Sequence, residues 1–177
     1  MGLLPLFAVI VILVKLTSPG PVFFNQKRLG RLGQIFVAYK FRTMLDRERT
    51  QHVEIKKGNP EVTVVGALLR RFKLDELPQL LNVLKGDMSL VGPRPPLPEQ
   101  MADYDRESLQ RLRVRPGLTG LAQVNGGTQM SWSERWQYDL QYVRLLSLAL
   151  DLRILLRTVV VLVLGEARFH TPRPEDR

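Results

Sequence analysis

The N-terminal segment MGLLPLFAVIVILVKLTSPGPVFF restricts the possible folds more than any other part of the chain. From Leu3 to Val14 no residue is charged, and Lys15 ends this apolar run. A helix of this length reaches about 20 Å at ~1.5 Å per residue, whereas the hydrocarbon core of a bilayer is roughly 30 Å thick. We therefore expect a helix that does not span a membrane.

Three interpretations of this apolar run differ in where the helix would lie. A signal peptide is disfavoured, because no basic residue precedes the run and no small-x-small cleavage site follows it. A buried helix of a soluble domain remains an alternative. An interfacial or re-entrant membrane helix is favoured, because the run is apolar all round and basic residues between Lys15 and Arg31 follow it closely. These bases predict that the rest of the chain lies in the cytoplasm.

The residue types that are absent limit the chemistry. The 177 residues suffice for one domain with a core, and the absence of cysteine removes disulfides, thiolate zinc sites and thiol nucleophiles. With His52 and His170 as its two histidines, the chain does not favour a histidine-rich metal site or a Ser-His-Asp triad. We expect any metal to be a hard, oxygen-ligated ion such as Mg²⁺.

The charge balance indicates an anionic partner. Lys and Arg number 26 against 17 Asp and Glu, so the formal net charge is +9 and the isoelectric point is near 10.3. Nucleic acid, a phospholipid surface and a phosphorylated small substrate would all fit this charge.

Apolar periodicity predicts a mixed α/β fold in which helices dominate. The stretch IFVAYKFRTM alternates as a strand does, and residues 65–72 are predicted to be a helix. Leucines between residues 74 and 84 predict a further helix, which must begin just before Pro78 because proline is tolerated only in a first turn. This places Asp75 at or near the N-cap and Glu76 in the first turn.

The remaining segments are predicted to be a polar loop and amphipathic helices. Residues 46–61 are polar and predict a surface loop. The stretch DYDRESLQRLRVRPG predicts a short charged helix ended by Pro116 and Gly117. Another helix is expected to begin at Ser131 or Ser133. Charged residues interrupt the apolar segment 145–164, which favours an amphipathic helix on a surface or in a core over a spanning one.

The adjacent acids Asp75 and Glu76 have a structural and a chemical interpretation. The helix dipole favours acids in a first turn by about 0.3–1 kcal/mol, which would explain them without function. However, Arg70, Arg71 and Lys73 surround them with positive charge, which is expected to lower the carboxylate pKa values and to attract phosphate.

Three more cations strengthen the chemical interpretation. Lys40 and Arg42 lie in the stretch KFRTM, and Arg94 lies in GPRP, a loop stiffened by prolines. Arginine is the preferred bidentate ligand of phosphate. One carboxylate could then attack a phosphorus while its neighbour holds Mg²⁺.

Two further acids are candidates. Asp139 lies in YDLQYV and Asp151 in LALDLRI. Asp151 interrupts an apolar face, so it either pairs with Arg153 or Arg157 or faces a site. Both alternatives remain open at this stage.

Taken together, SPGPVFFNQKRLGRLGQIFVAYKFRTM, LDELPQLLNVLKGDMSLVGPRP and RPGLTGLAQVNG resemble the bacterial sugar transferase family of monotopic phosphoglycosyl transferases. The likeness runs in order from about residue 15 to residue 158. It implies a membrane-associated helix over residues 1–18, a catalytic domain over residues 19–165 with amphipathic surface helices, and a polar tail over residues 166–177.

The resemblance also implies a reaction. A sugar-1-phosphate would pass from a UDP-sugar to polyprenyl (undecaprenyl) phosphate, releasing UMP, at the cytoplasmic face of the bacterial inner membrane. This step would initiate exopolysaccharide, O-antigen or other glycan assembly. Ping-pong kinetics would follow, because one site serves both substrates. We expect no nucleic-acid partner and leave a homodimer open.

The resemblance assigns roles to particular residues. Asp75 would be the nucleophile that forms a covalent phospho-sugar intermediate, and Glu76 would bind Mg²⁺. The bases Lys40, Arg42 and Arg94 would hold phosphates. Asp139 and Asp151 fall on acidic positions of the family and are expected to contact substrate.

The chain departs from the family pattern at two places. The family helix is re-entrant and is broken near its middle, and Pro5 matches this break, so almost all of the first arm is expected to be missing. The family often has Asn-Gly-Arg where this chain has Asn125, Gly126 and Gly127, which leaves the donor contacts open.

Three alternatives belong to other functional classes. A nucleic-acid-binding domain would explain the charge but not the apolar N-terminus or the acids. A non-catalytic membrane-surface scaffold would tolerate Asp75→Asn. A soluble aspartyl-phosphate hydrolase would place its aspartate after a buried strand, whereas Asp75 follows a basic helix.

Overall fold

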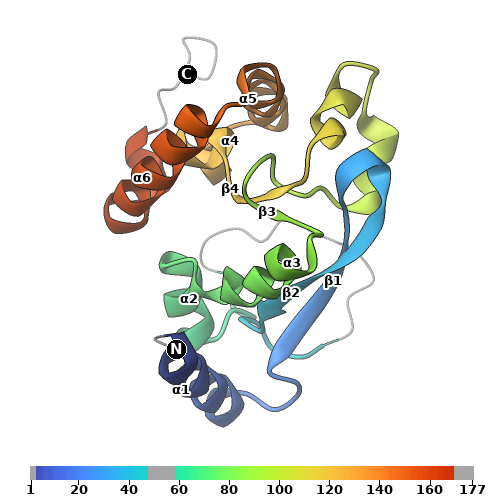
Figure 1. The fold of residues 1–177 in the computed structure, drawn as a ribbon. Coiled ribbons are helices and arrows are strands. Elements are labelled where there is room, and N and C mark those ends of the chain that lie inside the picture. Colours follow the sequence, from blue (N-terminus) through green and yellow to red (C-terminus); the bar gives the residue numbers. More distant parts are fainter. Residues whose placement is uncertain (1–2, 48–58, 170–177) are drawn as a thin grey trace. The chain divides into compact units, whose positions relative to one another are not determined.

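The computed structural model describes residues 3–47 and 59–169, so most of the predicted polar loop and of the polar tail lies outside the described residues. Helices dominate, and the strands form two small two-stranded sheets, as expected for a mixed α/β chain (Figure 1). The chain divides into two compact units. The first comprises residues 1–25 and 39–78, and the second comprises residues 26–38 and 79–177.

The first unit is built around helix α1 (Leu3–Thr17) and helix α2 (Val64–Arg71), which contact each other. Its core consists of Ile10, Val14, Phe41 and Leu69. The predicted helix over residues 65–72 is therefore confirmed. Lys15, which ends the apolar run in the sequence, lies in the last turn of α1.

Helix α1 has two apolar faces with different surroundings. The buried face contributes Ile10 and Val14 to the core, whereas Val9 and Ile12 are among the exposed apolar residues of the opposite face. The prediction of an apolar helix too short to span a bilayer is consistent with this structure, since no described helix has the length and hydropathy to cross a membrane.

Helix α2 begins at Thr63, whose side chain accepts a hydrogen bond from the amide of Gly66 at 2.9 Å. Gly66 allows the helix to approach the preceding chain very closely, because a Cβ atom at this position would lie 2.0 Å from the carbonyl oxygen of Thr43. The contact places α2 and its basic last turn, Arg70 and Arg71, at the segment that follows strand β2.

Strands β1 (Phe23–Leu29) and β2 (Ile35–Phe41) form a hairpin, in agreement with the strand predicted from IFVAYKFRTM. A hydrogen bond from the Gly30 amide to the Gln34 carbonyl, 2.7 Å, closes the connection, which contains the 3-10 turn η1 (Arg31–Gly33). Phe41 at the end of β2 packs between Phe7 and Phe23, with ring centroids 5.3 and 5.5 Å away.

The predicted helix over residues 74–84 is divided in two. A 3-10 helix, η2 (Leu74–Gln79), precedes α3 (Leu80–Lys85). Pro78 has no N–H to donate to an α-helical hydrogen bond, so the tighter turn precedes the α-helix. The predicted apolar face is only partly buried, because Leu81 and Leu84 are 51% and 83% exposed.

The second unit is built around a parallel pair of strands and three helices. Strands β3 (Ser89–Val91) and β4 (Gly117–Thr119) pair in parallel, with Ser89 opposite Gly117. Helices α4 (Leu121–Val124), α5 (Trp132–Leu145) and α6 (Leu148–Leu164) follow. The core of this unit is formed by Val91, Val124, Tyr142, Ile154 and Val161.

Short 3-10 helices replace the short charged helix that was predicted before Pro116. They are η3 (Pro98–Asp103) and η4 (Ser108–Arg113). The prediction for α5 is confirmed, because Ser131 caps the helix and forms a reciprocal capping box with Glu134. Helix α6 begins at Leu148 and not at Leu145, since Ser147 is its N-cap. Two further 3-10 turns are η5 (Gly127–Gln129) and η6 (Glu166–Phe169).

Candidate active site

The predicted acids Asp75 and Glu76 lie in the first turn of η2, in the first unit. Both are largely buried, with 9% and 7% of their surfaces exposed. Burial of two adjacent acids is unusual, since carboxylates are almost never buried without a partner. The helix dipole alone does not explain why both acids are buried.

Lys40 pairs with Glu76. Its Nζ atom lies 2.7 Å from Glu76 Oε1, and the two side chains are 15% and 9% exposed. Lys40 comes from strand β2 and Glu76 from η2, so the fold joins two residues that are far apart in the sequence. The structure thereby brings together three of the predicted site residues: Lys40, Asp75 and Glu76.

The carboxylate of Asp75 differs from that of Glu76. Its Oδ1 atom is buried and has no hydrogen-bond partner among the described residues. Burial and the neighbouring Glu76 raise the pKa of Asp75, while Lys40, Lys73 and Arg70 oppose this shift. The sequence predicted a lowered pKa from the bases alone, and this expectation was wrong because desolvation outweighs them. A buried carboxylate oxygen without a partner among the described residues is poorly solvated, and this is the main cause of the raised pKa.

The backbone next to this pair is strained. Lys73 has a φ of 55°, in the left-handed region that residues with a side chain adopt rarely. It joins α2 to η2, and its carbonyl accepts a hydrogen bond from the Glu76 amide at 3.2 Å. Such residues cost about 1–3 kcal/mol and cluster at functional sites.

The two arginines of the first unit have structural contacts. Arg42 is 6% exposed, and its guanidinium donates to the carbonyls of Ser18 (2.8 Å) and Pro19, where α1 ends. Arg70 donates from Nε to Thr43 Oγ1 at 2.8 Å. Arg42 thus holds the turn after α1, and its predicted phosphate contact stays a prediction.

The other predicted residues belong to the second unit. Arg94 lies in the loop after β3 and is only half buried, although Pro93, Pro95 and Pro96 around it are buried. This arrangement makes Arg94 the least buried residue of a stretch that is otherwise enclosed.

Asp139 lies on α5 and is 1% exposed. Its Oδ2 atom forms an ion pair with Arg111 of η4, and its Oδ1 atom is buried without a hydrogen-bond partner among the described residues. Burial raises the pKa of Asp139 to about 6, although Arg111, Arg135 and Arg94 each lower it. Desolvation is therefore the dominant influence on this carboxylate.

Asp151 lies in the first turn of α6 and accepts a hydrogen bond from the hydroxyl of Tyr142 at 2.9 Å. The two alternatives given for Asp151 from the sequence did not include this contact. Burial and the Asp151 carboxylate raise the pKa of Tyr142. The pair joins α5 to α6 inside the core of the second unit, and a substrate contact of Asp151 stays a prediction.

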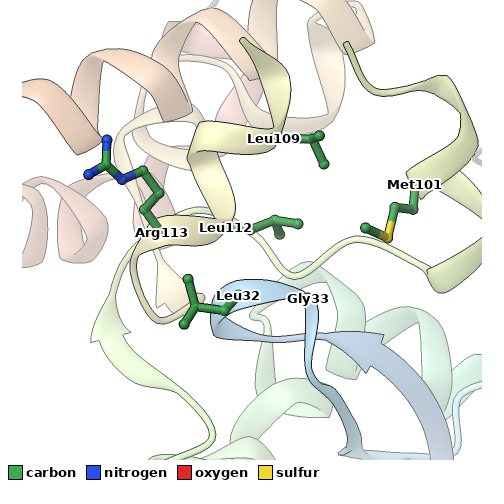
Figure 2. Close-up of a pocket in the computed structure, with 6 residues that line it drawn as sticks. All are labelled: Leu32, Gly33, Met101, Leu109, Leu112 and Arg113. Carbon is green, nitrogen blue, oxygen red and sulfur yellow. The ribbon is translucent and has the colours of Figure 1, made fainter. Parts of the chain in front are cut away.

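The second unit contains a pocket of about 220 Å³ (Figure 2). Its lining is mostly apolar and includes Leu32, Met101 and Leu112, with Arg113 as its charged member. It contains no carboxylate and none of the predicted site residues. We therefore do not assign the reaction to this pocket.

Sequence reasoning missed two contacts that organise these residues. Arg111 was treated as one base of a charged helix, and Tyr142 was not considered. The bases of RLRVRPG alternate along the chain, but this spacing does not single out Arg111. Tyr142 had no sequence signal either.

The part of the chain that the structure describes contains no cluster of three or more histidine, aspartate or glutamate residues that could hold a metal alone. Mg²⁺ at phosphoryl-transfer sites usually takes one or two carboxylates, and substrate phosphates supply further ligands. The carboxylate of Glu76 satisfies that smaller requirement, and it adjoins the candidate nucleophile Asp75. The residues present therefore fit Mg²⁺ bound together with a diphosphate.

Comparison with known proteins identifies the family. Residues 1–165 match the bacterial sugar transferase family, and the chain belongs to it. The exopolysaccharide production protein ExoY of Rhizobium meliloti (strain 1021) is 40% identical over 93% of this chain and 80% of its own length. The uncharacterized sugar transferase EpsL of Bacillus subtilis (strain 168) is 45% identical over 91% and 78% of the two chains.

A longer relative carries a specific activity in its name. The UDP-glucose:undecaprenyl-phosphate glucose-1-phosphate transferase of Xanthomonas campestris pv. campestris is 46% identical over 94% of this chain, which covers 36% of the relative. The protein is thus a sugar transferase of the same family as these relatives.

Proposed function

We propose that this protein transfers a sugar-1-phosphate from a UDP-sugar to polyprenyl phosphate and releases UMP. The observation that carries this proposal is the buried Oδ1 of Asp75, which lacks a hydrogen-bond partner among the described residues and adjoins the Lys40–Glu76 pair. Relatives named as glucose-1-phosphate transferases that act on undecaprenyl phosphate support the choice of substrates.

The reaction would proceed in two displacements. Oδ1 of Asp75 attacks the phosphorus that carries the sugar, the bond from this phosphorus to the bridging oxygen breaks, and UMP leaves with that oxygen. An oxygen of polyprenyl phosphate then attacks the same phosphorus and displaces the Asp75 carboxylate, giving polyprenyl-diphospho-sugar. Dividing one transfer into two displacements is the general advantage of a covalent nucleophile.

Neighbouring residues would support the nucleophile. The buried position of Asp75 strips water from the carboxylate, and this makes the ionised form more nucleophilic. Lys40 and Lys73 lower the cost of that charge and attract the diphosphate. The left-handed Lys73 fixes the direction in which η2 leaves α2, and hence the direction of the Asp75 side chain.

Glu76 would hold Mg²⁺ when the donor is bound, which leaves Oδ1 of Asp75 for the attack on phosphorus. The ion would neutralise the diphosphate and polarise the bond that breaks. Lys40 would then move from Glu76 toward the phosphates or remain as a second positive charge at the same place.

Membrane association is part of the same proposal, because polyprenyl phosphate has a hydrocarbon tail. Helix α6 exposes an apolar row at a spacing of four residues, and Leu148, Leu152 and Leu156 are 76%, 53% and 73% exposed. Helix α1 exposes Leu4 and Leu16 at 69% and 79%. Exposed apolar faces of this size with basic residues nearby suit the interface of an anionic leaflet. We assign the protein to the cytoplasmic face of the inner membrane.

The decisive experiment measures UMP release from a panel of UDP-sugars, with Mg²⁺ and polyprenyl phosphate in detergent. Wild type is compared with Asp75→Asn and with Asp103→Asn, a matched control at an exposed acid. We expect acceptor-dependent release that is lost in Asp75→Asn and retained in the control. Equal release by Asp75→Asn would reject Asp75 as nucleophile, and no release by folded wild type would favour the scaffold alternative.

A further inference from the structure

The loop from Pro93 to Pro96 is held by its carbonyl groups. Each of the four successive carbonyls accepts one hydrogen bond, and the donors come from β1, η4 and β4 of the second unit. The pairs are Gly117 N to Pro93 O (2.9 Å), Arg111 Nη2 to Arg94 O (3.0 Å), Arg28 Nη1 to Pro95 O (2.9 Å) and Leu29 N to Pro96 O (3.0 Å).

Three of the four residues in this loop are prolines, which have no N–H group. The carbonyls are therefore the main backbone groups through which the rest of the protein can hold the loop. Two of the four donors are backbone amides and two are the side chains of Arg28 and Arg111. The two side chains hold the central residues of the loop, Arg94 and Pro95.

Both arginines are themselves fixed. Arg111 is 4% exposed and forms the ion pair with Asp139, while its Nη1 donates to the hydroxyl of Tyr104 at 2.8 Å. The Tyr104 ring in turn packs edge-on against Trp136 of α5, with centroids 5.0 Å apart. An arginine held at three points has one available orientation, as bidentate and tridentate guanidinium contacts require.

Arg28 is fixed in a similar way. Its Nε and Nη2 atoms both donate to the side-chain oxygen of Gln26, at 3.1 and 2.6 Å, and this leaves Nη1 directed at the Pro95 carbonyl. Gln26 and Arg28 lie two apart on β1, so their side chains share one side of the strand.

We propose that Arg28 and Arg111 are positioning residues that fix the path of the Pro93–Pro96 loop and thereby the direction of the Arg94 side chain, and that Asp139 acts through Arg111. The effect of these residues on catalysis rests on the proposed function, in which Arg94 holds a phosphate. Their effect on the path of the loop is independent of the proposed function.

This proposal changes the role expected for Asp139. A carboxylate that is 1% exposed and paired with an arginine has no surface to offer a substrate, and its negative charge would repel a phosphate. Its contribution to phosphate binding is therefore indirect. It holds the guanidinium that holds the carbonyl of Arg94, and its charge also acts on the Arg94 side chain.

Amide hydrogen exchange tests the loop without requiring any activity. We would measure the peptide covering residues 92–101 in Arg111→Lys, Arg28→Lys and Asp139→Asn, each of which removes part of the attachment. The control is Arg144→Lys, which alters an exposed ion pair with Glu107 (2.7 Å) in the same unit. We expect exchange in this peptide to accelerate about ten-fold or more in the three variants and to remain unchanged in the control, with α6 equally protected in all.

Kinetics then separates an indirect role of Asp139 from a direct one. If Asp139 acts through Arg111, the double variant Asp139→Asn/Arg111→Lys should lose about as much kcat/KM as the worse single variant, because both remove one unit. If Asp139 contacts substrate, the two losses should multiply. We expect each single variant to lose about 10- to 100-fold, mainly through a higher donor KM.

The outcomes are distinguishable. Unchanged amide exchange in all folded variants would overturn the proposal. If the kcat/KM losses of Asp139→Asn and Arg111→Lys multiply in the double variant, the indirect role of Asp139 is rejected. If the Arg111 variant does not fold, Arg28→Lys still tests the loop, because Arg28 is only half buried. If the wild type releases no UMP, the proposed function fails while the exchange result still decides the role of the two arginines.

Discussion

Lys40 of β2 and Glu76 of η2 form an ion pair of 2.7 Å in the first unit, although 35 residues separate them in the chain, and the buried nucleophile candidate Asp75 is the immediate neighbour of Glu76. A buried pair of this kind contributes little net stability, because desolvation offsets the attraction. Removing one partner is costly, since the remaining charge is left without compensation. The pair therefore keeps two charges in place beside Asp75.

Lys40→Met is expected to lower the free energy of unfolding by about 3 kcal/mol, because Glu76 remains buried without this cation. Lys40→Met combined with Glu76→Leu should recover most of the loss. Thermal and urea unfolding of the three variants measure this. Equal losses in the single and double variants would contradict the argument.

Glu76→Gln is expected to raise the Mg²⁺ concentration that gives half-maximal UMP release, by about ten-fold or more, because one carboxylate ligand becomes a neutral amide. Titration of Mg²⁺ at saturating donor measures the change, and chelation by EDTA should abolish release in the wild type. An unchanged Mg²⁺ requirement would remove Glu76 from the metal site. Asp103→Asn serves as the control for a general change in charge.

Asp75→Asn is expected to abolish activity by roughly 10⁴-fold or more while making the fold more stable at pH 7. The pKa of Asp75 is raised by burial, so the folded state favours the protonated acid. The cost of the buried charge is absent at low pH and increases as the pH rises through the raised pKa. Asparagine carries no such charge. A lower melting temperature of Asp75→Asn at pH 7 would contradict this explanation.

Protonation of Asp139 near pH 6 is expected to have opposite effects on stability and on activity. Its pKa is raised from 3.8 to about 6, so its contribution to stability decreases as the pH rises from about 4 to about 6. Its ion pair with Arg111 requires the charged form, so loop positioning fails as the pH falls through the same range. The groups that influence Asp139 are Arg111 of η4, Arg94 of the loop, Arg135 of α5 and Tyr104.

The matching measurement compares kcat/KM and melting temperature between pH 5 and pH 7.5 in wild type and Asp139→Asn. Acid loss of activity should be smaller in the variant, which is already impaired and has no Asp139 proton to gain. Asp75 also contributes to the acid limb in both proteins, so only the difference between the two profiles is informative.

Helix α6 is expected to contact lipid through its exposed leucines. The double variant Leu152→Gln/Leu156→Gln should bind anionic liposomes at least about ten-fold more weakly, because full burial of each leucine is worth about 1.5–3 kcal/mol. Its melting temperature should not fall, since both side chains are already exposed. Leu84→Gln on α3, also exposed, is the control in a flotation assay.

Local patterns allowed the sequence to predict several elements correctly. Capping chemistry at Ser131 and apolar spacing in residues 65–72 are short-range signals, and α5 and α2 formed where these signals placed them. The predicted helix is divided near Pro78, and the missing N–H group of proline is a local cause of this division. The apolar spacing that predicted this helix did not predict that Leu81 and Leu84 are exposed.

The site was predicted less completely, because its chemistry depends on burial and on long-range contacts. Adjacent bases correctly marked Asp75 as a candidate, yet the sign of its pKa shift followed from desolvation, which no neighbouring residue encodes. Likewise the inward turn of Arg111 depends on how η4 packs against α5. The pairing of Tyr142 with Asp151 joins two helices and had no local signal.

The four hydrogen bonds to the Pro93–Pro96 loop have a consequence for altering the enzyme. A carbonyl is present in every amino acid, so a backbone held in this way does not depend on the side chain at position 94. Replacing Arg94 should therefore change the group that is presented while the chain keeps its path. A loss of activity in such a variant can therefore be attributed to the missing guanidinium and not to a displaced loop.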